Sequence, residues 1–351
     1  MALVRSDRHK LLWKQPATAD IPSELSENIS RHWVTTPLGK LEVLYAEPSE
    51  TAPQQEKALL FQHGGFGFGA EWIPYMTWFS QRGYRCYAVS LRGHGGSWKP
   101  RFFQMVWRYG KRDMAADLGY CYTWISAFEA AQKNENFNPE NLVLVGHSAG
   151  GGLGQYFLSQ GLGEVGGLVL MGPFPSWGGL GVYANWFKLD PWFAPRYYIR
   201  DLWHPRSPLS STSLVHGAFF SQEFPTAKVQ EFELQMPEYE SMVWPLGFML
   251  PLAKVHRVVR AIIGWKNNGT RLLVVAGEKD KLMALPIMQK LAVTYREAIR
   301  KMLGVAPCVE ENANEETPLP LAIVKGSGHH IQNDLYWEDG ANQIMSFLEK
   351  L

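Results

Sequence analysis

Short apolar runs alternate with amphipathic segments along most of this chain. The runs have the length and composition of buried strands, and they lie at residues 57–62, 84–90, 141–145, 166–171, 270–276 and 321–325. The segments with helical spacing of apolar residues lie at 70–82, 111–131, 285–302 and 337–351. An earlier pair, 32–36 and 40–45, alternates apolar and polar positions as a β-hairpin does. Strands that alternate with helices in this way predict an α/β fold with a doubly wound, mostly parallel sheet.

The alternation stops between residues 173 and 265. This segment contains many prolines and the aromatic residues Trp177, Trp186, Trp192, Phe193, Tyr197, Tyr198, Trp203, Phe219, Phe220 and Trp244. It is too apolar for a flexible linker. We therefore expect a mainly helical lid, defined as residues 173–265, inserted into a core formed by residues 31–172 and 266–351. Residues 1–30 are expected to form an irregular arm, in which Leu11, Leu12 and Trp13 can dock on the rest of the protein.

Composition narrows the classes of partner. Of the 351 residues, 34 are basic and 33 acidic, so the net charge of +1 gives no reason to expect nucleic acid or an anionic membrane as a ligand. Cys86, Cys121 and Cys308 are too widely spaced for a metal cluster or a disulfide framework, which favours a reducing compartment. Because no apolar stretch approaches the length of a membrane span and the first ten residues are rich in charge, we expect a cytoplasmic protein without a membrane span. The pattern indicates no particular oligomeric state.

A serine lies at the centre of a glycine-rich turn. Residues 146–150, Gly-His-Ser-Ala-Gly, follow the 141–145 strand and lead into the start of a helix. In the pattern G-x-S-x-G between a strand and a helix, the serine sits on a strained turn with its hydroxyl exposed, and the glycines permit close approach of strand and helix. Because the chain has 33 glycines, the pattern alone could arise by chance. The preceding strand favours a nucleophilic Ser148.

A second glycine-rich loop follows the 57–62 strand. Residues 63–69, His-Gly-Gly-Phe-Gly-Phe-Gly, precede a predicted helix and should expose unpaired backbone N–H groups. Such a loop can serve as a phosphate cradle or as an oxyanion hole. It matches neither G-x-G-x-x-G nor the P-loop pattern, and Ser148 supplies a nucleophile that an oxyanion hole would serve. The sequence therefore favours the oxyanion hole.

Two later strands end in residues that can act with a serine. The strand at 270–276 leads to an acid, Glu278 or Asp280, and the strand at 321–325 leads to a histidine, His329 or His330. Reactive groups gather at the carboxyl ends of parallel strands. We therefore expect one acid and one histidine from these loops to lie near Ser148.

The order of these motifs resembles that of the α/β-hydrolase fold superfamily, from about residue 31 to 351. The resemblance is carried by residues 63–65, 83–95, 146–150, 277–280 and 326–329. It implies a catalytic triad of Ser148, His329 and Asp280. It also implies an oxyanion hole formed by the backbone N–H groups of Ala149 and Gly65, with Phe66 as the alternative to Gly65.

The same resemblance favours one residue of each candidate pair, the two histidines and the two acids. The family places its histidine directly after a glycine, which favours His329 and leaves His330 as a packing or pocket residue. The family spacing favours Asp280, so Glu278 is expected to face solvent or to cap the next segment. Residues 330–334 resemble the corresponding loop of haloalkane dehalogenases, but those enzymes and the epoxide hydrolases use an aspartate nucleophile, so Ser148 argues against both chemistries. His94 is expected to fix its turn rather than to act in catalysis.

These residues predict a serine hydrolase that cleaves an ester, lactone or thioester of a bulky apolar small molecule through an acyl-enzyme, with no cofactor and no metal. The aromatic lid favours such a substrate over a sugar or a phosphate. Two other classes stay open. One is a non-hydrolytic enzyme on the same scaffold, such as an acyltransferase, a carbon–carbon bond hydrolase or lyase, or a cyclase. The other is a binding protein with a vestigial triad.

Overall fold

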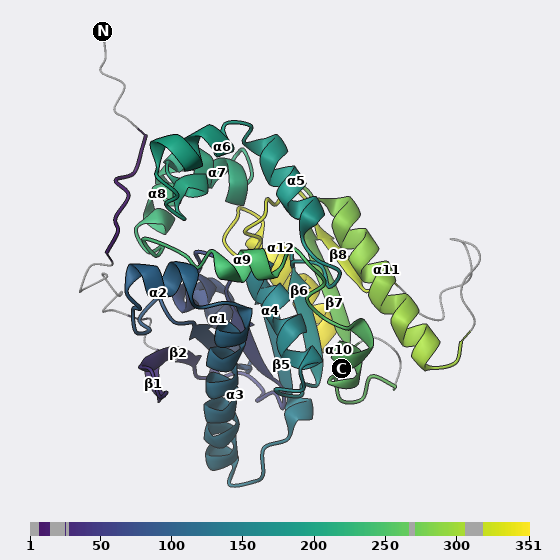
Figure 1. Cartoon of the computed structure of the whole chain (residues 1–351). Coiled ribbons are helices and arrows are strands. Elements are labelled where there is room, and N and C mark those ends of the chain that lie inside the picture. Colours follow the sequence, from purple (N-terminus) through teal and green to yellow (C-terminus); the bar gives the residue numbers. More distant parts are fainter. Residues whose placement is uncertain (1–6, 15–24, 26–27, 267–270, 306–318) are drawn as a thin grey trace.

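The computed structural model describes residues 7–14, 25, 28–266, 271–305 and 319–351. Within these ranges, eight strands form one sheet in the order β1-β2-β4-β3-β5-β6-β7-β8 (Figure 1). The strands are β1 (Ile29–Thr35), β2 (Lys40–Ala46), β3 (Ala58–Gln62), β4 (Arg85–Ser90), β5 (Leu142–His147), β6 (Gly167–Met171), β7 (Leu272–Gly277) and β8 (Leu321–Val324). β2 is antiparallel to β1 and to β4, whereas the neighbours from β4 to β8 are parallel. The predicted α/β fold with a mostly parallel sheet is confirmed.

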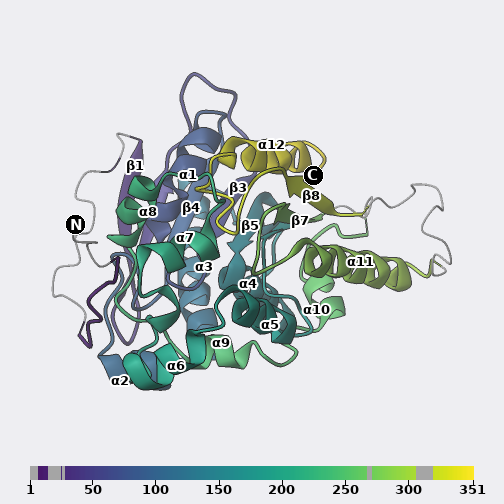
Figure 2. The same ribbon diagram turned by 90° about the horizontal axis from the view of Figure 1, so that it is seen from above.

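Helices cover both faces of the sheet, and Figure 2 shows the sheet between these two layers. The helices outside the lid are α1 (Ile73–Ser80), α2 (Phe102–Trp107), α3 (Lys111–Lys133), α4 (Ser148–Ser159), α11 (Leu285–Met302) and α12 (Trp337–Leu348). One face packs on α1 and α12 through residues such as Phe61 and Ile344. The other packs on α3, α4 and α11 through residues such as Leu60 and Leu291. The central strands β3 and β5 are buried along their whole length, which explains their continuous apolar sequences.

The lid lies between β6 and β7, before the strand that leads to Asp280, so the predicted helical insertion is present. Its α-helices are α5 (Leu180–Leu189), α6 (Phe193–Pro195), α7 (Thr212–Phe219), α8 (Thr226–Glu233), α9 (Val243–Gly247) and α10 (Val255–Arg260). Helices α5 to α9 lie over one edge of the sheet (Figure 1), and α10 returns to pack against α4 and α11. The lid therefore lies over the carboxyl end of β5, a central strand of the sheet.

Residues 7–14 run along the lid. Arg8 forms a β-bridge with Ser211, and the His9 N–H donates to the Ser210 carbonyl at 2.9 Å. The ring of Trp13 lies 4.8 Å from that of Phe102 in α2, between ring centroids. This segment therefore contacts both the core and the lid.

Two cysteines lie in the interior. Cys86 and Cys121 are free thiols with no exposed surface, and burial raises the pKa of each well above its usual value. Cys308 lies outside the described residues. Across the ranges that the structure describes, no helix combines the length and the apolar character needed to cross a membrane.

Candidate active site

The backbone turns abruptly at Ser148. β5 ends at His147, α4 begins at Ser148, and Ser148 has a φ of 53°. A positive φ is uncommon for a residue with a side chain, so the surrounding structure must hold it. Gly150 allows the close approach that this requires, because a Cβ there would lie 2.1 Å from the His63 carbonyl oxygen. The turn presents Ser148 to a cavity beneath the lid.

Ser148, His329 and Asp280 form a continuous chain of hydrogen bonds. His329 Nε2 lies 2.9 Å from Ser148 Oγ, and His329 Nδ1 lies 2.8 Å from Asp280 Oδ2. Because a carboxylate only accepts hydrogen bonds, Nδ1 carries the ring proton and Nε2 is left to accept the Ser148 hydroxyl hydrogen. All three side chains are buried. The structure thus brings together the three residues that the sequence nominated as a triad.

The loop after β7 holds Asp280 in place. Asp280 Oδ1 accepts the N–H groups of Leu282 and Met283, both at 2.8 Å, so its two oxygens have separate partners. Glu278 is exposed, and its Oε2 accepts the Gly326 N–H at 2.9 Å. Glu278 therefore lies on the surface and caps a neighbouring segment.

The loop after β3 approaches Ser148 closely. A Cβ on Gly64 would lie 2.9 Å from Ser148 Cβ, so a residue with a side chain would not fit there. The Gly67 N–H donates to the Gly64 carbonyl at 3.2 Å and closes a four-residue turn. Phe66, the third residue of this turn, has a φ of 58°. The turn thus has a strained residue beside the candidate nucleophile.

The predicted oxyanion donors differ in their hydrogen bonds. Gly65, Phe66 and Ala149 all line the cavity next to Ser148. The Phe66 N–H donates to Glu240 Oε2 at 2.9 Å. Because that donor already has a buried partner, the structure favours Gly65 over Phe66 as the loop's contribution to an oxyanion hole.

Glu240 is a buried lid carboxylate with three hydrogen bonds. Besides Phe66, its Oε2 contacts His94 Nε2 at 2.8 Å, and its Oε1 accepts the Ser241 N–H at 2.7 Å. His94 has no exposed surface, and its Nδ1 lies 2.8 Å from the Arg92 carbonyl oxygen. His94 therefore fixes the turn after β4, as expected, and also links that turn to the lid.

The cavity at Ser148 has a volume of about 310 Å³ and a mostly apolar wall. Of the lid aromatic residues singled out from the sequence, Trp186, Phe193, Phe219 and Trp244 line it. The others do not, and Trp192 is 75% exposed. Glu240 is the one side chain with a carboxyl group among these lining residues, and His329 is the one histidine. The hydrogen-bonded Ser148 and His329 therefore lie at the wall of a small apolar chamber.

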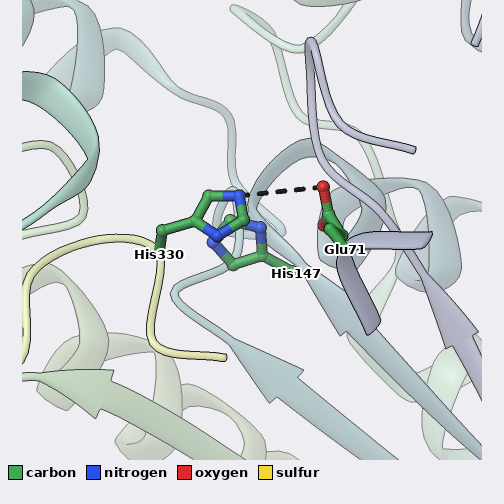
Figure 3. Close-up of side chains that lie close together, drawn as sticks. All are labelled: Glu71, His147 and His330. Carbon is green, nitrogen blue, oxygen red and sulfur yellow. Dashed lines mark ion pairs between the residues drawn. The ribbon is translucent and has the colours of Figure 1, made fainter. Parts of the chain in front are cut away.

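A buried polar cluster lies behind the triad, formed by Glu71, His147 and His330 (Figure 3). The His147 and His330 rings are 4.7 Å apart between centroids, and His330 Nε2 lies 3.7 Å from Glu71 Oε2. Burial raises the pKa of Glu71 to about 8 and lowers the pKa of both histidines well below the usual value. All three groups are therefore uncharged near neutral pH. His330 packs in this cluster and does not line the cavity.

The cluster has the ligand types of a metal site, but its spacing is wide. Its ligand atoms lie within 4.8 Å of one another, whereas a tetrahedral zinc ion needs ligands about 3.4 Å apart. Glu71 is also engaged already, since it accepts the Phe68 N–H at 3.2 Å and Gln332 Nε2 at 3.1 Å. We therefore interpret these residues as a buried polar layer that packs against the segments carrying Ser148 and His329, with His147 Nε2 lying 3.0 Å from the His329 carbonyl oxygen.

The sheet order, the turn at Ser148 and the hydrogen-bonded triad together define a known class of protein. A family model described as "Alpha/beta hydrolase family" matches residues 59–339, and the chain belongs to this family.

Solved structures agree with this assignment at the level of fold. The carboxylesterase CesB from Bacillus subtilis is 17% identical with a TM-score of 0.56, and the match covers 93% of each chain. A bromoperoxidase from Bacillus anthracis is 14% identical with a TM-score of 0.59, covering 91% of this chain and 100% of the other. A thermophilic esterase from Thermogutta terrifontis is 16% identical with a TM-score of 0.58, covering 92% and 98%. At these identities the likeness shows the fold alone.

Two buried carboxylates at the site were not found by sequence reasoning. Glu240 bonds to a residue 174 positions away, and Glu71 to one 261 positions away. No recurring motif surrounds either residue. The available signal was weak: Glu71 is a lone acid before two large apolar residues, Trp72 and Ile73, whereas Glu240 stands between Tyr239 and Ser241, two residues after Glu238.

Proposed function

We propose that this protein is a serine hydrolase that cleaves an ester, lactone or thioester of a bulky apolar small molecule through an acyl-enzyme. The observation that carries the proposal is the hydrogen-bonded chain from Ser148 through His329 to Asp280 at the wall of an apolar cavity. A serine hydroxyl is a weak nucleophile near neutral pH, so it needs a base within hydrogen-bond distance. His329 satisfies this condition.

In the proposed reaction, Ser148 Oγ attacks the substrate carbonyl carbon while His329 Nε2 takes the hydroxyl proton. Asp280 keeps the Nδ1 proton in place and stabilises the imidazolium that forms. The carbonyl oxygen becomes an oxyanion that accepts the N–H groups of Ala149 and Gly65. His329 then protonates the leaving group, and a water molecule, activated by the same nitrogen, releases the acid from Ser148.

The cavity supports an apolar substrate and limits the size of the bulky group that it can enclose. Its volume of about 310 Å³ is at the lower end of the range for small-molecule pockets, and aromatic lid residues form much of its wall. Besides Ser148, His329 and the glycine-rich loop of residues 63–69, few polar groups line it. We therefore propose that recognition depends on shape and apolar contact, with the reacting carbonyl as the main polar group of the substrate.

Covalent labelling tests the acyl-enzyme. A fluorophosphonate should label the wild-type protein at Ser148 and should not label Ser148→Ala. The wild type should also hydrolyse p-nitrophenyl phenylacetate, an aromatic ester, and Ser148→Ala should lose at least about 10³-fold in kcat. Absence of labelling, or hydrolysis that survives the substitution, would overturn the proposal.

Product analysis separates hydrolysis from acyl transfer. The same ester is incubated with an excess of an alcohol or an amine, and the products are identified. A hydrolase releases mainly the free acid, whereas an acyltransferase forms the new ester or amide. Predominant transfer to the added acceptor would show that the protein is an acyltransferase and not a hydrolase. The proposed acyl-enzyme would still stand.

A further inference from the structure

The oxyanion loop has a conformation that its own sequence does not favour. Residues 64–67 form a turn closed by the Gly67 N–H and the Gly64 carbonyl, in which Phe66 has a φ of 58° and Gly65 is not among the residues with positive φ. This is the pattern of a type II turn, whose third residue is usually glycine. A bulky side chain in that position costs about 1–2 kcal/mol. Some contact outside the turn must therefore hold Phe66.

Glu240 provides that contact. Its Oε2 accepts the Phe66 N–H at 2.9 Å, and this carboxylate is buried, so water cannot readily replace it. The hydrogen bond fixes the direction of the peptide between Gly65 and Phe66. Without it, this peptide could rotate by about 150° to the type I form, in which the third residue has a negative φ. The rotation would remove the strain and turn the Gly65 carbonyl oxygen toward the side of the loop that Glu240 now occupies.

The pair of Glu240 and His94 is neutral as a unit. His94 Nδ1 faces the Arg92 carbonyl, which only accepts, so Nδ1 carries a hydrogen. His94 Nε2 lies 2.8 Å from Glu240 Oε2, and a hydrogen must lie between these two atoms, whichever of them it is bonded to. The pair is therefore either a carboxylate with an imidazolium or a carboxylic acid with a neutral imidazole, and its net charge is zero in both cases.

This neutrality matters for the proposed reaction. A Cβ on Gly65 would lie only 3.8 Å from Glu240 Oε2, so the carboxylate is adjacent to the loop that would bind the oxyanion. An unpaired negative charge there would oppose the negative charge that develops on the substrate oxygen. His94 compensates that charge within the same buried contact.

We infer that Glu240 is a positioning residue that holds the oxyanion loop in its active conformation and makes this conformation depend on the seating of the lid. The inference rests on the proposed function, because it concerns the stabilisation of an oxyanion. Glu240 belongs to the lid, between α8 and α9, whereas Phe66 and His94 belong to the core. When the lid is displaced from this contact, the loop loses the acceptor that stabilises Phe66 at a positive φ. The Gly65 N–H lies on the preceding peptide, so this rotation does not move it directly, but it leaves the donor on a glycine whose backbone is no longer fixed. The oxyanion hole is then fully preorganised only when the lid is closed over the cavity.

A pair of substrates can test this role directly. Wild type, Glu240→Ala and Glu240→Gln are assayed with p-nitrophenyl phenylacetate and with its thionoester, in which sulfur replaces the carbonyl oxygen. Sulfur accepts hydrogen bonds weakly, so the thionoester gains little from the oxyanion hole. All rates are divided by the concentration of sites labelled by a fluorophosphonate, so that misfolded protein does not contribute.

We expect Glu240→Ala to lower kcat for the ester by about 10–100-fold, part of the 10²–10³ typical of one oxyanion donor. The thionoester rate should fall much less, so the ratio of ester to thionoester rates should drop. Glu240→Gln can keep its oxygen toward the Phe66 N–H only by turning its amide nitrogen toward the Ser241 N–H, so it should restore only a small part of that ratio.

Glu233→Gln is the matched control. Glu233 is another buried lid glutamate, whose Oε2 accepts the Thr212 hydroxyl at 2.9 Å, and it does not line the cavity. It should leave the rate ratio unchanged.

Each of four results would overturn the inference. Equal losses with ester and thionoester after Glu240→Ala, or a rise in KM alone, would show that Glu240 only shapes the cavity or the fold, and would overturn the inference. Unchanged kcat would do the same. A wild type that neither reacts with the fluorophosphonate nor hydrolyses the ester would overturn the proposed function itself, and this inference with it.

Discussion

Glu71 accepts a hydrogen bond from Gln332 at 3.1 Å, which connects the segment before α1 to the loop that carries His329. The carboxyl group is buried, and its pKa is raised from 4.5 to about 8. The loop of the proposed catalytic histidine is thus joined to a buried acid whose raised pKa favours its protonated form near neutral pH.

This protonation predicts a pH dependence of stability. Between about pH 4.5 and 8 the folded protein keeps the Glu71 proton and the unfolded chain releases it, so the contribution of Glu71 to stability falls as the pH rises. The slope is at most about 1.4 kcal/mol per pH unit. Glu71→Gln removes the titration and keeps a neutral side chain of similar shape. The free energy of unfolding of Glu71→Gln, measured in urea, should exceed that of the wild type by an amount that grows from pH 5 to pH 8. A difference that stays constant over this range would contradict the raised pKa.

Asp280→Asn should impair catalysis without changing the fold. The new amide nitrogen would face His329 Nδ1 and favour the ring form with its proton on Nε2, which cannot accept the Ser148 hydroxyl hydrogen. We expect kcat to fall by about 10³–10⁴ with little change in KM. Glu278→Gln, at the exposed acid of the same loop, should stay within about twofold of wild type. If Glu278→Gln cost as much as Asp280→Asn, the assignment of the acid would be wrong.

Two adjacent aromatic residues should differ in their effect on substrate choice. Phe193 lines the cavity, whereas Trp192 is 75% exposed and does not. Phe193→Ala should lower kcat/KM for p-nitrophenyl phenylacetate by about 10–100-fold, and much less for p-nitrophenyl acetate, which is too small to use the full wall. Trp192→Ala should change neither value appreciably. Equal effects of Phe193→Ala on both esters would argue against selection by the lid.

Two helical glycines should respond in opposite ways to alanine. A Cβ on Gly150 would lie 2.1 Å from the backbone oxygen of His63, whereas one on Gly119 in α3 would lie 3.7 Å from Phe157, an ordinary contact. Gly119→Ala should therefore raise the free energy of unfolding by about 0.5–1 kcal/mol. Gly150→Ala should destabilise the protein and abolish fluorophosphonate labelling. The midpoints of urea denaturation measure both effects, and a stable, reactive Gly150→Ala would contradict the close approach.

The core elements follow from local patterns and could be predicted. The helix expected at 285–302 coincides with α11 (Leu285–Met302), and the helix expected at 111–131 ends two residues later, at Lys133. Buried parallel strands are continuous apolar runs, and long helices show a clear period, so these elements carry their own signal. The residues of the proposed triad could also be identified from the sequence, because each follows a strand that could be located.

The lid and the supporting carboxylates could not be predicted in the same way. The lid consists of short helices, in which the helical spacing of apolar residues is not sustained long enough to define an element. The same holds for α2, outside the lid, which has only six residues. Glu240 acts through Phe66 and His94, both more than 140 positions away. Such contacts arise from the packing of the lid on the core, which no local pattern specifies. For the same reason, only the position of Glu240 gives a ground for preferring Gly65 to Phe66 as the proposed donor.

The segment of residues 7–14 limits how the lid can open. It bridges to Ser211 through Arg8, Leu12 accepts a hydrogen bond from His204 at 3.0 Å, and Trp13 packs on Phe102 of α2. A lid that swung away as one rigid body would have to break either its bonds to this segment or the packing of Trp13 on Phe102, as well as the Glu240 bonds. Access to the cavity is therefore expected to depend on partial rearrangement of the lid, at a rate that residues distant from Ser148 help to set.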